Sequence, residues 1–229
     1  MDLQLKVQKP LKELVYLELK HKILTGEIQS ETRLMEINLA EKMNVSRTPI
    51  REAISRLADE GLVQVEPRRG AYVSKISIKN MLDIFETREN LEGFTAYLAS
   101  IRSTDEQKAE LRKITEKYAE AIKRKDKEAV IELDEAFHNY IVGCCNNDTL
   151  AELIKYIQDL SLRFRYLYYD DFSLYPGTAE QHTKIMEAIS AGDADLARKE
   201  GEEHIRILKN FIFELGKKLV KSSVQRLEN

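Results

Sequence analysis

The chain has 229 residues, of which 43% are hydrophobic and 33% charged, with only nine glycines and four prolines. This composition excludes a disordered or fibrous chain and favours a helix-rich globular protein with room for two domains. No apolar run approaches the ~18 residues of a membrane span, and Met1–Lys12 lacks the apolar core of a signal peptide. We therefore expect a cytoplasmic protein without a membrane partner. The adjacent Cys144 and Cys145 make a poor disulfide, which fits a reducing compartment.

The formal net charge of −3 argues at first against a nucleic-acid partner. Residues 1–78 hold 13 Lys and Arg against 11 Asp and Glu, whereas residues 79–229 hold 23 against 28. This asymmetry is mild. Any inference about nucleic acid must therefore rest on local patterns of charge rather than on the total.

Residues 1–76 show the pattern of three helices followed by a β-hairpin. Apolar residues at steps of three and four predict helices at 10–25, 36–43 and 46–60, and Gly26 and Gly61 end the first and third. Two short alternating strands at 62–66 and 71–75 are joined by Pro67-Arg68-Arg69-Gly70. These elements predict a winged helix-turn-helix as the first domain.

Strand signals vanish from Ile78 onward, and helical periodicity covers residues 78–101, 104–124, 126–145, 148–170, 178–191 and 193–221. We expect the polar residues from Lys217 to fray. Residues 77–229 are therefore predicted to form a second domain, an all-α helical bundle. The predicted fold class is mainly α.

Asn44-Val45-Ser46 separates two short predicted helices, as in a helix-turn-helix, where the second helix lies in the major groove of DNA. That helix begins Arg47-Thr48-Pro49-Ile50-Arg51, which places two arginines four residues apart on one side. Arginine at such positions bridges guanine or grips phosphate. The local pattern therefore predicts a DNA-binding helix.

Further cations accompany this helix. Arg33 precedes the motif, Arg56 lies further along the helix, and Gly70 at the hairpin tip allows a close backbone approach to a groove wall. The alternative is an ordinary solvated face of a small domain, but the convergence of these residues on one edge favours DNA. The candidate DNA-binding residues are Arg33, Ser46, Arg47, Thr48, Arg51, Arg56, Arg68, Arg69 and Gly70.

The motif resembles the winged helix-turn-helix signature of GntR-type bacterial regulators, in the residues Leu39-Ala40, Val45 to Ala53, Leu57, Glu60-Gly61-Leu62-Val63 and Gly70. The all-α remainder resembles the ligand-sensing FCD domain of the FadR subfamily. The resemblance implies that Arg33, Arg47, Arg51 and the wing around Gly70 contact operator DNA. It also implies a homodimer that binds a palindromic operator.

Three of the four histidines, His138, His182 and His204, lie in the helical region, and Asp134 shares a helix face with His138. His182 and His204 are predicted on helices joined by a tight turn, ~13 and ~16 Å from it, so they lie nearly level. Three imidazoles and one carboxylate suit a divalent ion, Zn first, with Ni, Mn or Fe as alternatives. The other possibility is that each histidine is an ordinary core or surface residue, as we expect for His21.

The FCD resemblance adds two expectations. The set Asp134, His138, His182 and His204 matches the metal-binding pattern of many FCD domains, and Arg88 matches a position that faces the effector cavity. A buried guanidinium needs an anion, which a small carboxylate bridging Arg88 and the metal would supply. The alternative for Arg88 is an ion pair with Glu89 or Glu92. Arg163 and Arg165 are further effector-binding candidates on the same reasoning.

These inferences predict a DNA-binding transcriptional regulator, in which effector binding in the helical domain changes the relative orientation of two DNA-binding modules. A metal-dependent, hydrolase-like enzyme that uses the three-histidine, one-aspartate site is the alternative. No general base is well placed for that reaction, so no catalytic residue is assigned. A third reading treats the metal as purely structural.

Overall fold

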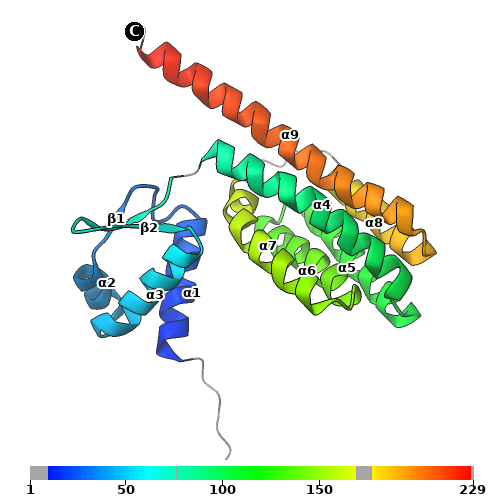
Figure 1. The fold of residues 1–229 in the computed structure, drawn as a ribbon, viewed down its shortest axis with the longest axis horizontal. Coiled ribbons are helices and arrows are strands. Elements are labelled where there is room, and N and C mark those ends of the chain that lie inside the picture. The colour runs from blue at the N-terminus through cyan, green and yellow to red at the C-terminus, as the bar shows by residue number, and fades with distance from the viewer. Residues whose placement is uncertain (1–9, 76, 169–176, 228–229) are drawn as a thin grey trace, which may run out of the picture. The chain divides into compact units, whose positions relative to one another are not determined.

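The computed structural model describes residues 10–75, 77–168 and 177–227, without the side chains of residues 159, 162–168 and 215–227 (Figure 1). The chain divides into two compact units, Met1–Ile76 and Ser77–Asn229. The fold class is the predicted one: a winged helix-turn-helix and a helical bundle.

The N-terminal unit has the order α1 (Leu11–Leu24), β1 (Arg33–Leu34), α2 (Glu36–Met43), α3 (Arg47–Asp59), β2 (Val63–Glu66) and β3 (Gly70–Val73). Its sheet is antiparallel with the order β1-β3-β2, and Arg33 on β1 lies opposite Tyr72 on β3. The sequence predicted only the β2–β3 hairpin. A strand of two residues is too short to show alternation, so β1 is detected only through its pairing with β3.

The core of this unit lies between α1 and α3. Ile50 and Leu57 of α3 are buried, as are Leu19 and Ile23 of α1. Asn44 ends α2 in the left-handed conformation with φ of 51° and turns the chain into α3. Because α3 uses its apolar side for this packing, its opposite side, which carries Arg47 and Arg51, remains exposed.

The second unit consists of α4 (Ile78–Arg102), α5 (Asp105–Arg124), α6 (Lys127–Cys144), α7 (Asp148–Tyr168), α8 (Thr178–Ala191) and α9 (Ala194–Leu227). Side chains cap several of these helices, and Thr104 and Gln107 form a reciprocal capping box on α5. The helix α9 continues to Leu227, beyond the predicted end at residue 221. Among the described residues, no helix combines the length and the hydropathy that crossing a membrane requires.

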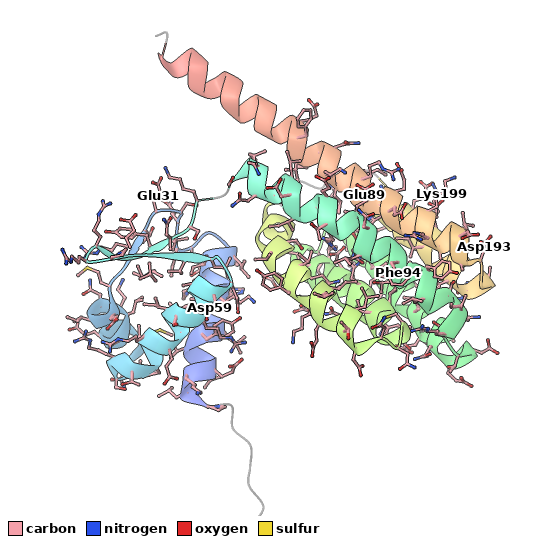
Figure 2. The ribbon with its side chains drawn as sticks, in the orientation of Figure 1. Glu31, Asp59, Glu89, Phe94, Asp193 and Lys199 are labelled. Carbon is pink, nitrogen blue, oxygen red and sulfur yellow. The ribbon has the colours of Figure 1, made fainter. Side chains whose placement is uncertain are left out.

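Two glycines allow α4 and α9 to pack closely. A Cβ atom on Gly93 would lie 2.5 Å from Cγ of Glu202, and one on Gly201 would lie 3.3 Å from Cα of Gly93. Glu89 of α4, which is labelled in Figure 2, adds a polar link, because it accepts hydrogen bonds from Arg206 and Lys209 of α9. The close packing brings polar residues of α4 next to a histidine of α9 inside the bundle.

Candidate DNA-binding face and buried histidine site

Two arginines on the exposed face of α3 form a cluster with a carboxylate of α2. Arg51 donates from Nε to Oε1 of Glu36 at 3.1 Å and from Nη2 to Oε2 at 2.9 Å. Arg47 donates from Nη2 to the same Oε2 atom at 3.0 Å. Hydrogen bonds from Arg51 and then Arg47 lower the pKa of Glu36 to about 2. The two arginines are therefore held by a carboxylate at the start of α2.

A groove of about 550 Å³ lies between α3 and the wing sheet. Charged side chains of Arg33, Glu36, Arg47 and Arg51 line it, together with Gly70 at the start of β3. Three exposed apolar side chains, which the sequence analysis did not single out, line the same groove: Met35, Ile37 and Val65. The structure thus brings four of the predicted DNA-binding residues to one concave surface.

Gly70 and Arg33 are direct neighbours in this groove. The backbone of Gly70 has φ of +111°, a conformation that side-chain-bearing residues rarely adopt, and a Cβ atom there would lie 3.2 Å from Nε of Arg33. The φ value therefore favours glycine at this position, and a Cβ atom there would displace the Arg33 guanidinium by a few tenths of an ångström.

The other predicted residues lie at the rim of the motif. Ser46 is the N-cap residue of α3 but its side chain makes no capping hydrogen bond, and Thr48 is exposed in the first turn. At the wing tip, Arg69 pairs with Glu66 at 2.7 Å. No carboxylate lies within ion-pair distance of Arg33 or Arg68 in the part of the chain that the structure describes.

Arg56 lies on the side of α3 that faces α1. Its Nη1 donates to Glu13 of α1 at 2.7 Å, and its guanidinium stacks 3.6 Å from the ring centroid of Tyr16. Arg56 does not line the groove that contains Arg47 and Arg51. Arg56 therefore lies apart from the arginines of the groove, although its side chain is half-exposed.

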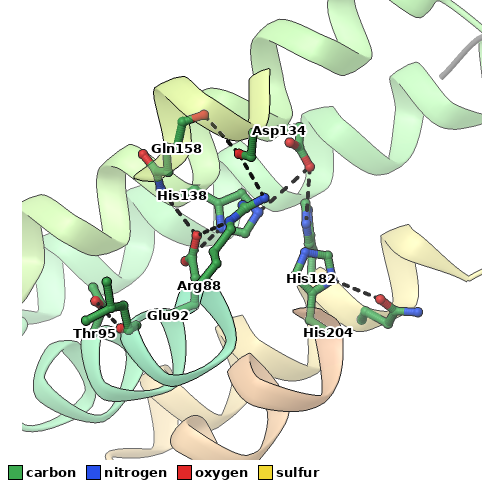
Figure 3. Close-up of polar contacts among 11 residues, drawn as sticks. Arg88, Glu92, Thr95, Asp134, His138, Gln158, His182 and His204 are labelled. Carbon is green, nitrogen blue, oxygen red and sulfur yellow. Dashed lines mark hydrogen bonds and ion pairs between the residues drawn. The ribbon is translucent and has the colours of Figure 1, made fainter. Parts of the chain in front are cut away.

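The helical unit brings His138 of α6, His182 of α8 and His204 of α9 together in its interior (Figure 3). All three are buried, and one ring nitrogen from each lies within 4.8 Å of the others. Oδ1 of Asp134 lies 3.5 Å from Nε2 of His182 and 3.9 Å from Nε2 of His138. The four residues of the predicted metal set are therefore neighbours, and the three imidazoles form a possible metal site.

Outer hydrogen bonds orient two of these imidazoles. Nδ1 of His138 lies 3.1 Å from Oε2 of Glu92, and Nδ1 of His204 lies 2.8 Å from Oε1 of Gln181. Both oxygens only accept, so each Nδ1 carries the proton and each Nε2 carries the lone pair that a metal requires. Nε2 of His138 and of His204 are buried and make no hydrogen bond to any described residue.

The electrostatics of the site favour a neutral His204 imidazole and an ionised Glu92 carboxylate. Burial, followed by the charges of His182 and His138, holds the pKa of His204 well below its usual range. Burial raises the pKa of Glu92, but His138 and Arg88 outweigh this effect and hold it well below its usual range. Neutral imidazole is the form that binds a metal ion.

Arg88 is buried beside these histidines. Its Nε donates to Oε1 of Glu92 at 2.9 Å, and its Nη1 lies 3.4 Å from the hydroxyl of Ser161. Its Nη2 is buried without a hydrogen bond to any described residue. Of the two ion pairs considered from sequence, the one with Glu92 forms, whereas Glu89 pairs with α9.

The side chains of Arg163 and Arg165 lie outside the described residues, so their predicted role stays a prediction. The pair of Glu92 with Arg88 was considered from their spacing of one helical turn, but the contact of Glu92 with His138 was not. The roles of Gln158 and Gln181 were also missed. These two residues offered no signal, because their contacts with Glu92 and His204 depend on how separate helices pack.

A winged helix-turn-helix joined to a helical bundle defines a DNA-binding regulator. Residues 11–73 match the model of the bacterial regulatory proteins of the gntR family, and residues 83–207 match the FCD domain. The chain belongs to the GntR family of bacterial regulators, in the FadR subfamily, as the sequence motifs indicated.

Curated relatives support this assignment. The chain is 29% identical over 205 residues to the HTH-type transcriptional repressor RspR of Escherichia coli (strain K12), with 90% of each chain covered. It is 33% identical over 190 residues to the gluconate operon transcriptional repressor of Bacillus licheniformis, covering 80% of this chain and 76% of the relative. These relatives are transcriptional regulators, and the prediction of a regulator rather than an enzyme is confirmed.

The solved structure of E. coli McbR/YncC is also similar. It superposes with a TM-score of 0.76 at 26% identity, covering 91% of this chain and 99% of that one. The similarity extends over both units of the chain.

Proposed function

We propose that this regulator binds a palindromic operator as a homodimer, and that a small carboxylate effector controls it from a metal site in the helical unit. As a DNA-binding regulator it acts in the cytoplasm, where bacterial DNA lies. One observation carries the effector proposal. Nη2 of Arg88 is a buried donor without an acceptor among the described residues, beside three imidazoles that can hold a cation.

The metal ligands in this proposal are His138, His182, His204 and Asp134. Three imidazole nitrogens and one carboxylate suit Zn²⁺, with Ni²⁺, Mn²⁺ or Fe²⁺ as alternatives. When bound, the ion supplies a Lewis acid that accepts a carboxylate oxygen. Glu92 and Gln181 hold two of the imidazoles in the required tautomer.

Arg88 binds the effector in this proposal. A buried N–H without a partner costs about 1–3 kcal/mol, and an incoming carboxylate removes that cost with a charge-assisted hydrogen bond. Glu92 already neutralises part of the guanidinium charge and fixes its position. The remaining Nη2 atom is therefore oriented for a ligand before the ligand arrives.

Operator binding is assigned to the groove and its rim in the N-terminal unit. Arg47 and Arg51 approach base edges from α3, while Arg33 and the wing tip contact the backbone and a groove wall. Phosphate contacts are assigned to five further residues: Ser46, Thr48, Arg56, Arg68 and Arg69. Effector and operator must change each other's affinity by the same factor, because the two binding equilibria are linked.

Two measurements test the proposal. Purified protein is stripped with a chelator, reloaded with Zn²⁺ and melted in the presence of acetate, malate or citrate. We expect at least one carboxylate to raise the melting temperature of the metal-loaded wild type but not of Arg88→Gln. Stabilisation by the metal with no response to any carboxylate would instead indicate a purely structural ion.

The second measurement addresses DNA. Wild-type protein enriches sequences from a random duplex library, and the enriched duplex is used in a gel-shift titration. We expect a palindromic consensus, an affinity that falls steeply with salt and no shift with Arg47→Ala. Intact binding by a correctly folded Arg47→Ala variant would refute the assignment of α3 as the reading helix.

A further inference from the structure

Glu36 occupies a particular edge of the Arg51 guanidinium. The two hydrogen bonds from Arg51 use Nε and Nη2, which form the side edge of the planar group. Its end edge, formed by Nη1 and the second hydrogen of Nη2, remains available. The Arg51 side chain is 66% exposed and lines the groove.

Guanine presents O6 and N7 side by side in the major groove, and arginine binds them with two parallel N–H groups. The end edge of a guanidinium offers such a pair. A carboxylate on the side edge therefore leaves the guanine-reading edge free, while it prevents the side chain from rotating. Arg47, which shares Oε2 of the same carboxylate, is restrained from the same point.

We propose that Glu36 is the specificity-determining residue of the DNA-binding face, because it fixes Arg51 and Arg47 in the orientation that reads guanine and opposes their transfer to phosphates. This inference deepens the operator-binding role and rests on it. Glu36 contacts no base itself in this proposal, so it is a positioning residue.

The charge of Glu36 weakens non-specific binding to DNA. A carboxylate in a groove that receives DNA repels phosphates. It also forms ion pairs with two arginines that would otherwise neutralise the phosphates. Because the two arginines hold its pKa at about 2, the group keeps its charge at every pH at which the protein is used. The cluster therefore lowers the affinity for arbitrary DNA but preserves the affinity for sequences in which guanines are correctly placed.

The test compares wild type with Glu36→Gln, which keeps the size of the side chain and removes its charge. Three duplexes are titrated: the sequence that wild-type protein enriches from a random library, a scrambled duplex of the same composition, and the enriched duplex with 7-deazaguanine at its conserved guanines. We expect Glu36→Gln to bind the scrambled duplex more tightly, with the salt slope steeper by about 1–2 as arginines move to phosphates. The ratio of specific to non-specific affinity should fall roughly 10-fold.

Loss of N7 provides an independent readout. Replacement of guanine by 7-deazaguanine should weaken wild-type binding strongly and Glu36→Gln much less, since the freed arginines no longer depend on N7. Glu36→Asp keeps the charge but shortens the side chain, so it should also lower the affinity ratio. If Glu36→Asp leaves the ratio of specific to non-specific affinity unchanged, charge alone accounts for the effect of Glu36, and the positioning role is overturned.

Glu52→Gln is the matched control. Glu52 is an exposed residue of α3 that pairs with Lys12, and its loss changes the net charge of the unit equally. It should leave the affinity ratio unchanged. A ratio that is equal in wild type and Glu36→Gln overturns the inference alone, whereas failure of wild type to enrich any sequence overturns the operator-binding proposal and the inference with it.

Discussion

Oε2 of Glu92 lies 3.1 Å from Nδ1 of His138, and both side chains are buried. A carboxylate in this position fixes the imidazole tautomer and makes the opposite ring nitrogen a stronger ligand. Glu92→Gln removes the charge and keeps the shape. We expect it to weaken metal binding by about 10–100-fold, measured by competition with a chromophoric chelator.

The control for Glu92 is Glu86→Gln on the exposed side of α4. Because Glu92→Gln also leaves the buried Arg88 without a full countercharge, circular dichroism and the melting temperature of the metal-free protein must accompany the measurement. A correctly folded Glu92→Gln protein with wild-type metal affinity would show that the contact with His138 has no influence on the metal.

Metal content is expected to depend on His182 and His204. Either histidine replaced by alanine removes one of the three converging imidazoles, so the purified variant should lose its stoichiometric divalent metal by elemental analysis. The variant should also melt at a lower temperature, because bound metal stabilises the folded state by mass action. His21→Ala, an exposed change in α1, should keep both properties. Equal metal content in all three variants would contradict the site.

The stability of the N-terminal unit is expected to fall in acid partly through Glu36. Its folded pKa is about 2, against a usual value of 4.5, so its ion pairs stabilise the fold fully above pH 4.5 and this contribution is lost as pH falls towards 2. The stability difference between wild type and Glu36→Gln, from urea unfolding, should shrink over that interval. In Arg51→Ala, carbon-detected NMR should show the pKa of Glu36 shifted back towards 4.5.

Substitutions at Gly70 and Gly61 distinguish the effect of backbone strain from the effect of contact with Arg33. Both have positive φ, of +111° and +70°, but a Cβ atom on Gly61 would meet no atom within 4 Å. Replacement of either glycine by alanine should destabilise the N-terminal unit by about 1–2 kcal/mol. Only Gly70→Ala should also weaken binding of the enriched duplex, because its Cβ atom displaces the Arg33 guanidinium. Comparable DNA affinity in both variants would show that the position of Arg33 is unimportant.

Much of the fold follows from local patterns. Apolar residues such as Ile50 and Leu57 recur at helical spacing and are buried in the predicted face of α3. Gly26, Gly61 and Gly192 lie at predicted breaks and all have positive φ. These features depend on a few consecutive residues, so periodicity and turn chemistry are enough to detect them.

Part of the histidine arrangement was also predictable, whereas the approach of His138 on α6 to the histidines of α8 and α9 depends on tertiary packing. Asp134 and His138 share a helix face, and His182 and His204 lie at similar distances from the turn at Gly192. Their placement follows from the rise of an α-helix and the antiparallel direction of two joined helices. Only the structure supplies the partners Glu92 and Gln181, which come from other helices or depend on the register between α8 and α9.

A helix-turn-helix with an arginine-bearing reading helix and a helical bundle with a histidine set could both be predicted, since local spacing encodes them. The neighbours of Arg51 and Arg56 depend on tertiary packing. Glu36 precedes Arg51 by 15 positions and holds it, Glu13 precedes Arg56 by 43 and holds that residue on the α1 side. Contacts between elements depend on the angle and register at which helices pack, and these follow from the whole core rather than from any short stretch of the chain.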